Sequence, residues 1–213
     1  MSSQDPHANP IRGRFNSWLL AKFEDDLHEV MGPLKTEHIG SLAGTLIEIG
    51  AGNGVNFRYY PPGVRLVAYE PNPYMHDRLQ ASARTHGLDV ELRGESAERL
   101  DFEEGTVDAV VCTLVLCTVP DPVRTISEVR RVLKPGGRFF FIEHVAAERG
   151  TFLRRMQDLL HGPWHYVFEG CHTNRETGAL LEQAGFSRVQ IDLCSFEKMP
   201  PLVAPQIAGV ATK

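Results

Sequence analysis

The sequence predicts a doubly wound α/β fold with a seven-stranded, mostly parallel sheet. Two observations predict it. Short apolar segments alternate with segments of helical periodicity over most of the 213 residues. The first apolar segment also ends in a glycine turn, Gly50-Ala51-Gly52-Asn53-Gly54, and the next ends in an acid, Glu70. Strand, glycine turn, helix, strand and terminal acid together form the first half of a Rossmann-like nucleotide-binding unit.

The segment before the first strand has no partner in this sheet. Residues 1–10 are polar and are expected to be disordered. Apolar residues then recur every three or four positions over 11–31, which predicts an amphipathic helix that ends at Gly32-Pro33. This helix either packs on the core or covers the site as a lid. We assign residues 1–40 to a tail and lid helix, and residues 41–213 to the main domain.

The remaining elements alternate regularly. The helix before the sixth strand has a capping-box pattern, Thr173 with Glu176, and is expected to close at Gly185. Lys134-Pro135-Gly136-Gly137 predicts a tight turn before the fifth strand. Connections in α/β units are usually short, so the long aromatic- and histidine-rich segment 146–172 is expected to cover the substrate. Strands are expected at 45–49, 64–69, 90–93, 107–113, 138–145, 187–193 and 203–212, and helices near 55–60, 73–86, 122–133 and 174–184.

Composition excludes several classes of protein. The net charge is −5 without a Lys/Arg cluster, which disfavours a nucleic-acid partner. The four cysteines have no C-x-x-C spacing, so we expect neither a metal site nor a disulfide framework. The N-terminus lacks an apolar signal core, and no run of about 18 apolar residues would span a membrane. These observations predict a soluble, cytoplasmic protein; they say nothing about its oligomeric state.

The glycine spacing indicates which nucleotide is bound. A dinucleotide fingerprint needs a third glycine where this chain has Val55. The pattern is instead E-x-G-x-G-x-G, in which Glu48 is placed to hold a cationic amine and Glu70 to accept hydrogen bonds from ribose hydroxyls. This combination favours S-adenosyl-L-methionine over NAD. Ser96 and Ala97, after the third strand, are expected at the adenine edge, although Ser96 also suits an ordinary helix N-cap.

Longer motifs identify a family. Residues 40–213 resemble class I S-adenosylmethionine-dependent methyltransferases, and among these the small-molecule thiol methyltransferases of the methyltransferase-like seven type. The animal members have an apolar N-terminal anchor where this chain has a charged amphipathic helix, which favours a soluble, microbial relative. The motifs are Asn56-Phe57 with Tyr60-Pro61-Pro62-Gly63, Pro71-Asn72-Pro73, Val111-Cys112-Thr113-Leu114-Val115-Leu116-Cys117, Glu128 to Gly137, Glu143-His144-Val145 and Arg175-Glu176-Thr177. The predicted cofactor-binding residues are Glu48, Gly50, Ala51, Gly52, Gly54, Asn56, Glu70, Pro71, Ser96, Ala97, Thr113 and Leu114.

The acceptor follows from the same segments. The apolar run 113–119, past the fourth strand, suits methyl transfer to an easily ionised thiol, and the candidate catalytic residues are His144, Glu143 and His172. Cys117 is expected to line the pocket. Asn72-Pro73-Tyr74 resembles a motif of base-methylating enzymes, but it follows the second strand rather than the fourth. Two alternatives stay open: N-, O- or C-methylation of a lipid, quinone or secondary metabolite, and a non-catalytic cofactor-binding subunit.

Overall fold

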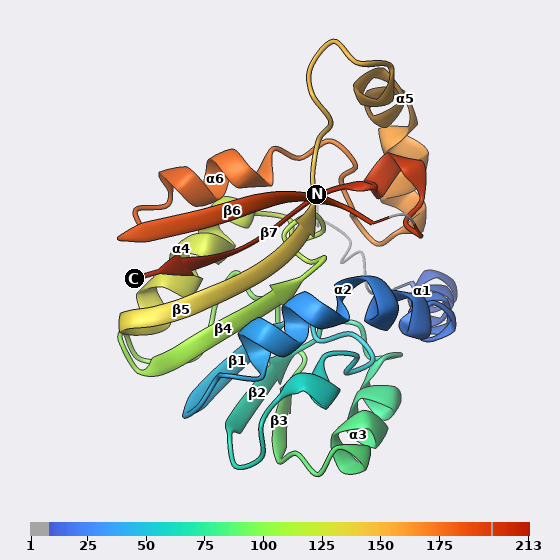
Figure 1. Cartoon of the computed structure of the whole chain (residues 1–213). Helices are drawn as coiled ribbons and strands as arrows, with labels where there is room; N and C mark the ends of the chain where they lie inside the picture. The colour runs from blue at the N-terminus through green and yellow to red at the C-terminus, as the bar shows by residue number, and fades with distance from the viewer. Residues whose placement is uncertain (1–8, 197) are drawn as a thin grey trace, which may run out of the picture.

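A computed structural model describes residues 9–196 and 198–213 of the chain (Figure 1). Seven strands form one sheet in the order β3-β2-β1-β4-β5-β7-β6. β7 is antiparallel to both of its neighbours, and the other pairs are parallel, so six strands point the same way. The predicted α/β fold is confirmed. The strands are β1 Thr45–Ile49, β2 Arg65–Tyr69, β3 Val90–Arg93, β4 Val107–Thr113, β5 Leu133–His144, β6 Arg188–Ser195 and β7 Pro205–Thr212.

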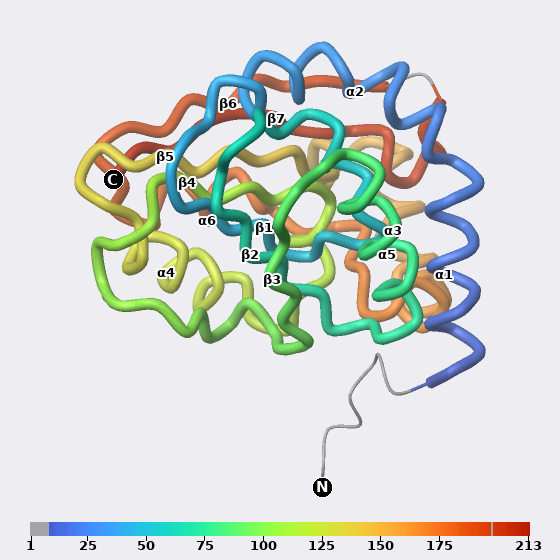
Figure 2. Tube along the Cα trace, turned by 90° about the horizontal axis from the view of Figure 1, so that it is seen from below, coloured from blue at the N-terminus to red at the C-terminus, as the bar shows by residue number. Residues whose placement is uncertain are grey.

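Helices cover both faces of the sheet. On one face α2 (Glu24–Ile39), α3 (His76–Thr85) and the short 3₁₀ helix η2 (Phe57–Tyr59) pack against an apolar cluster. On the other, α4 (Pro122–Val132) and α6 (Thr177–Gln183) pack against a second cluster. Figure 2 shows α2 and α4 on opposite sides of the strands. Because both faces are covered, β1 and β4 are buried along nearly their whole length, without the alternation of a strand that has one face in solvent.

The chain order of the strands reverses between β1 and β4. From β1 the chain continues to β2 and β3 on one side, and then returns to β4 on the other. The connections therefore diverge at the carboxyl ends of these two strands and leave a crevice, which is where doubly wound sheets bind ligands. The glycine turn after β1 and the apolar run after β4 both begin at this point.

The N-terminal segment differs from its prediction. The expected single helix is two: α1 (Pro10–Lys22) and α2, which meet at Phe23. α2 also continues through Pro33 to Ile39. A proline inside a helix costs about 3 kcal/mol, but Met31 and Ile39 on either side of it are fully buried in the core, and this packing holds the helix together. Of the predicted disordered residues, 1–8 lie outside the described part, whereas Asn9 caps α1 and Pro10 begins it.

Three local predictions are also wrong. The capping box does not form, because the Thr173 hydroxyl donates to the carbonyl of Gln157 and α6 begins only at Thr177. The expected turn at 134–137 is instead an irregularity within β5, where Leu133 pairs with Val107 and Arg138 already pairs with Ala109. The helix expected near 55–60 is the single turn η2.

The predicted substrate cover, 146–172, contains a helix, α5 (Phe152–Val167).

Candidate functional site

A cavity of about 580 Å³ lies at the carboxyl ends of β1 and β4. Its wall is largely apolar. α1 and α2 form one side, the loops after β1, β2, β3 and β4 form the floor, and the end of β5 and the segment around α5 complete it. The lining includes Phe15, Leu19, Leu20, Met31, Lys35, Gly50, Ala51, Gly52, Glu70, Pro71, Ser96, Ala97, Thr113, Leu114, Val115, Cys117, His144, Trp164, Phe168, Glu169, Cys171 and Lys198.

The glycine turn brings backbone close to this cavity. Gly52 has φ of +58°, a conformation that favours glycine, and a β-carbon there would lie 2.7 Å from the Leu20 side chain. Its N–H donates to Glu70 Oε2 at 2.7 Å, and the Asn72 N–H donates to Glu70 Oε1 at 2.8 Å. The acid at the end of β2 is thus held rigidly against the turn.

Glu48 lies beneath the turn and not on the cavity wall. Its Oε1 accepts from Asn56 Nδ2 at 2.8 Å, and Asn56 also donates to the Thr113 hydroxyl. Burial raises the pKa of Glu48 to about 7, despite that hydrogen bond. The cavity wall next to it carries Lys35, which is only 1% exposed. Burial lowers the pKa of Lys35 to about 8, and the Glu48 carboxylate opposes this shift.

The loop after β4 is held in a strained conformation. Leu114 has φ of +60°, which costs a non-glycine residue about 1–2 kcal/mol. The compensation comes from Glu143, whose carboxylate accepts from the N–H groups of Val115, Leu116 and Cys117 at 2.9, 2.9 and 3.2 Å. Glu143 is fully buried and does not line the cavity. This placement gives it a role in shaping the wall.

His144 lies next to a pair of thiols. Its Nε2 is 3.1 Å from Cys171 Sγ, and Cys171 Sγ is 3.9 Å from Cys117 Sγ. The indole N–H of Trp164 also points at Cys171, at 3.2 Å. The hydrogen bond with Cys117 and the nearby His144 and Trp164 hold the pKa of Cys171 well below its usual range. All four side chains line the cavity.

α1 and α5 both contribute residues to the cavity wall and lie against each other. Figures 1 and 2 both place them at the end of the sheet where the cavity lies. Arg12 and Asn16 of α1 donate to the carbonyls of Tyr166 and Val167 at 2.8 and 3.1 Å. On its inner side, Ser17 exchanges two hydrogen bonds with Asn53 of the glycine turn. The helix therefore bridges the predicted cofactor turn and the segment expected to cover the substrate.

Comparison with known proteins places this arrangement in a family. Residues 47–141 match the family described as a methyltransferase domain. Human thiol S-methyltransferase TMT1A is 39% identical over 209 residues, which cover 92% of this chain and 85% of the human protein. The chain belongs to the same methyltransferase family. Human thiol S-methyltransferase TMT1B is also 39% identical, over 203 residues that cover 90% of this chain and 80% of that protein.

The fold of this methyltransferase has solved counterparts. The crystal structure of a SAM-dependent methyltransferase from Aquifex aeolicus aligns with a TM-score of 0.63 over 92% of this chain and 97% of that one, at 19% identity. That likeness concerns the fold alone. Within the described residues of this methyltransferase, no helix is both long and apolar enough to cross a bilayer.

The predicted site residues of the methyltransferase fall into two groups. Most of them line the cavity, namely Gly50, Ala51, Gly52, Glu70, Pro71, Ser96, Ala97, Thr113, Leu114 and His144. Those outside the lining are Glu48, Gly54, Asn56, Glu143 and His172. Ser96 begins no helix, and its hydroxyl accepts from the Glu98 N–H at 3.5 Å. His172 packs instead against two other histidines, and burial lowers its pKa to about 4.

Sequence reasoning about the methyltransferase missed Lys35, Trp164 and Cys171. Lys35 lies in the part of α2 past Pro33, where the sequence predicts that the helix has already ended. Trp164 and Cys171 lie in the long segment 146–172, whose sequence does not indicate which side chains face the cavity. The aromatic content of that segment was a usable signal for Trp164. The spacing of Cys171 from Cys117, 54 positions apart, carried none.

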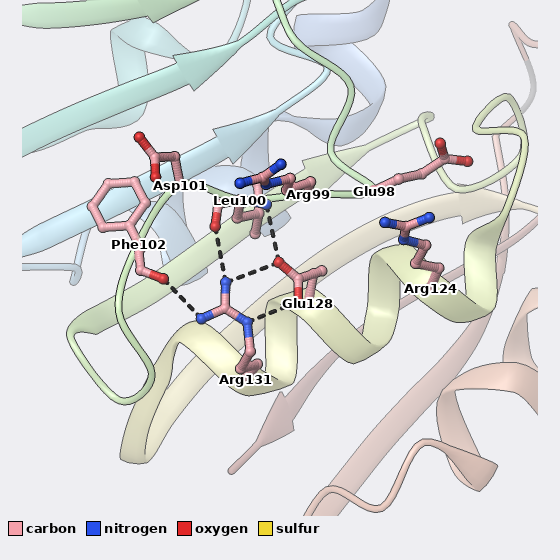
Figure 3. Close-up of a pocket in the computed structure, with 8 residues that line it drawn as sticks. All are labelled: Glu98, Arg99, Leu100, Asp101, Phe102, Arg124, Glu128 and Arg131. Carbon is pink, nitrogen blue, oxygen red and sulfur yellow. Dashed lines mark hydrogen bonds and ion pairs between the residues drawn. The ribbon is translucent and has the colours of Figure 1, made fainter.

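A second recess of the methyltransferase, of about 450 Å³, is polar and lies away from this cavity (Figure 3). Arg131 of α4 donates to the carbonyls of Leu100 and Phe102, and pairs with Glu128 at 2.7 Å. Glu128 in turn accepts from the Leu100 N–H at 3.1 Å. These side chains satisfy one another and fasten the loop after β3 to α4, so the recess has a structural role.

Proposed function

We propose that this methyltransferase transfers the methyl group of S-adenosyl-L-methionine to the sulfur of a small thiol. The single observation that carries the proposal is the cavity at the β1/β4 crevice, which joins a cofactor-type glycine turn and acid to an apolar wall. The 39% identity to thiol S-methyltransferases supports sulfur as the acceptor atom. We place the protein in the cytoplasm, where its four free cysteines stay reduced. The proposal includes no nucleic-acid partner.

The cofactor fits the polar features of the cavity. Glu70 is placed to accept from the ribose hydroxyls, and the glycine turn gives the amino-acid portion a close passage along the backbone. Ser96 and Ala97 lie where the adenine edge is expected. Lys35 is a buried ammonium on the same wall, and we propose that it donates a hydrogen bond to the carboxylate of the cofactor. Glu48, behind the wall, supports the charge of Lys35 in place of the direct contact expected from sequence.

Methyl transfer depends mainly on holding the two reacting atoms in line and on excluding water from them. A thiolate sulfur attacks the methyl carbon, the carbon–sulfonium bond breaks, and its electron pair stays on the departing sulfur as S-adenosyl-L-homocysteine forms. Both reacting charges disappear in this step, so a wall as apolar as Leu114, Val115 and Phe168 favours the transition state over the separated ions. Of the candidate catalytic residues, His144 alone lines the cavity. We therefore propose that His144 lies on the part of the wall where the acceptor thiol binds.

A panel of acceptors tests the proposal. The protein is incubated with methyl-labelled cofactor and, separately, with small thiols, amines, phenols and phosphatidylethanolamine vesicles. We expect thioethers from the thiols, with kcat/KM rising with pH as the acceptor ionises, because free thiols have a pKa of about 8.5. Efficient labelling of amines, phenols or lipid while every thiol stays inert would refute the thiol proposal in favour of the alternatives above.

Replacing Lys35 by Met tests the carboxylate assignment. We expect S-adenosyl-L-methionine to bind about 10- to 100-fold more weakly to Lys35→Met, because a charge-assisted hydrogen bond contributes about 1.5–3 kcal/mol. Decarboxylated S-adenosylmethionine should bind both proteins equally. Affinity of the unmodified protein for the full cofactor should also fall as pH rises through about 8, where Lys35 loses its proton. Calorimetry at several pH values measures all three.

Lys198→Met is the matched control. Lys198 also lines the cavity, but it is already paired with Asp26 and Glu29, at 2.9 and 2.5 Å. Its removal should change cofactor affinity less than threefold, an expectation based on the small contribution of exposed ion pairs. If Lys35→Met still prefers the carboxylated cofactor as strongly as the unmodified protein does, Lys35 does not hold that group.

A further inference from the structure

Three soft donor atoms converge on the inner wall of the cavity. They come from distant segments: Cys117 from the loop after β4, His144 from the end of β5, and Cys171 from the loop after α5. Their ligand atoms all lie within 4.8 Å of one another. All three residues are buried, and all three line the cavity. All the cysteines of the described chain, including Cys117 and Cys171, are free thiols in this structure.

We propose that Cys117, His144 and Cys171 bind a zinc ion whose fourth position opens into the cavity and takes the sulfur of the acceptor thiol. Two thiolates, one imidazole and one exchangeable position are a known donor set for catalytic zinc. The inference rests on the proposed thiol acceptor for its chemistry, although the site itself stands on the three protein ligands.

The distances fit tetrahedral coordination. Zinc bonds of about 2.3 Å to sulfur and about 2.0–2.1 Å to nitrogen put neighbouring sulfurs about 3.8 Å apart, and sulfur and nitrogen about 3.6 Å apart. The two sulfurs are 3.9 Å apart, and His144 Nε2 is 3.1 Å from Cys171 Sγ. The third pair, His144 Nε2 and Cys117 Sγ, lies within 4.8 Å, so small movements of these side chains would bring the three atoms to tetrahedral spacing.

The surroundings suit a bound ion. Trp164 donates its indole N–H to Cys171 Sγ at 3.2 Å, the kind of outer contact that orients a thiolate ligand. The N–H of His172 donates to the carbonyl of Cys117 at 2.8 Å, which fixes the two loops to each other. His144 Nε2 faces the sulfurs, while Nδ1 is buried without a partner among the described residues. Nε2 is therefore the ligating nitrogen.

The ion would supply what the cavity otherwise lacks, a means of holding a thiolate in apolar surroundings. The acceptor thiol binds in the fourth position and releases its proton to solvent. Its sulfur then forms a bond to the methyl carbon, and the carbon–sulfonium bond breaks with its electron pair left on the cofactor sulfur. The neutral thioether is a weaker ligand than a thiolate and leaves. His144 holds the ion here and accepts no proton.

The test must distinguish this site from a second group of side chains that could bind a metal ion. His161, His165 and His172 also bring their ring nitrogens within 4.8 Å, but outside the cavity lining. That group contains no sulfur, so cobalt(II) distinguishes the two. Only a cysteine-ligated cobalt ion gives a thiolate-to-metal charge-transfer band in the near ultraviolet.

The experiment titrates reduced, metal-free, full-length protein with cobalt(II) under nitrogen. We expect the charge-transfer band to saturate at one equivalent, and to be lost in Cys117→Ser and Cys171→Ser. Cys194→Ser, at the half-buried fourth cysteine on β6, and His161→Gln should keep it. X-ray absorption on the zinc-loaded unmodified protein should show two sulfurs at about 2.3 Å and at least one imidazole. This measurement needs no variant to fold.

Activity separates this inference from the proposed function. Chelation should lower thiol methylation about 100-fold or more, and zinc should restore it. Absence of the charge-transfer band, or its persistence in both cysteine variants, overturns the site. Full methylation of thiols by metal-free protein also overturns it, while leaving the thiol acceptor in place. A saturating band together with inert thiols supports the site and refutes the acceptor.

Discussion

Gly52→Val is expected to abolish cofactor binding while leaving the chain folded. The turn at Gly52 has φ of +58° and borders the cavity, and even a β-carbon would lie 2.7 Å from the Leu20 side chain. A valine side chain would therefore occupy the passage assigned to the amino-acid end of the cofactor. We expect affinity for S-adenosyl-L-methionine to fall at least about 100-fold, or about 2.7 kcal/mol, measured by calorimetry.

Gly63→Val is the matched control for that variant. Gly63 has a similarly positive φ of +83°, but a β-carbon there would meet nothing within 4 Å. Both substitutions should lower the free energy of unfolding by about 1–2 kcal/mol through backbone strain. Cofactor affinity should change only in Gly52→Val. Equal affinities in the two variants would show that the cofactor does not pass the glycine turn.

The central strands were predictable because they are mostly apolar runs with clear ends, whereas the edge strands β3 and β6 mix charged and apolar residues. Every expected strand is present, and β1, β3 and β4 begin and end where expected. Both faces of the sheet are covered, so the strand signal is nearly continuous apolarity that turn residues interrupt. Helix ends were less predictable. Pro33 marks a boundary by local rules, whereas burial of Met31 and Ile39 carries α2 through it. Such packing is a tertiary effect that no local window contains.

In the site, too, the residues that follow strand ends were predictable from the sequence, and those placed by tertiary packing were not. Gly50, Gly52, Glu70 and Leu114 follow strand ends, and the topology of the sheet brings strand ends together, so a sequence pattern located them on the cavity wall. The convergence of Cys171 on Cys117 depends on how α5 folds back, which spacing does not encode. The absence of C-x-x-C spacing predicted no metal site; that prediction stays untested, and the convergence is what leads us to propose one.

Removing α1 is expected to disable catalysis far more than it destabilises the fold. Residues Phe15, Leu19 and Leu20 of this helix line the cavity, yet within the described chain α1 contributes to the two apolar clusters only through the partly buried Leu20. Closure of a site excludes water and fixes the reacting atoms, so losing it should lower kcat/KM about 100-fold or more. Deletion of residues 1–22 is the change to make. Steady-state methylation and thermal unfolding measure the two effects.

The position of the cut matters, because α2 belongs to the core. Leu27 and Met31 are buried in the cluster beneath the sheet, so a deletion through residue 31 would unfold the domain and test nothing about the lid. Two full-length variants complete the design. Ser17→Ala, which breaks one tie between α1 and the glycine turn, should give a smaller loss of the same kind. Ile11→Ala, on the outer face at 80% exposure, should give none. Normal turnover by the shortened chain would mean that α1 only packs against the domain, and that α5 and the glycine turn exclude water without it.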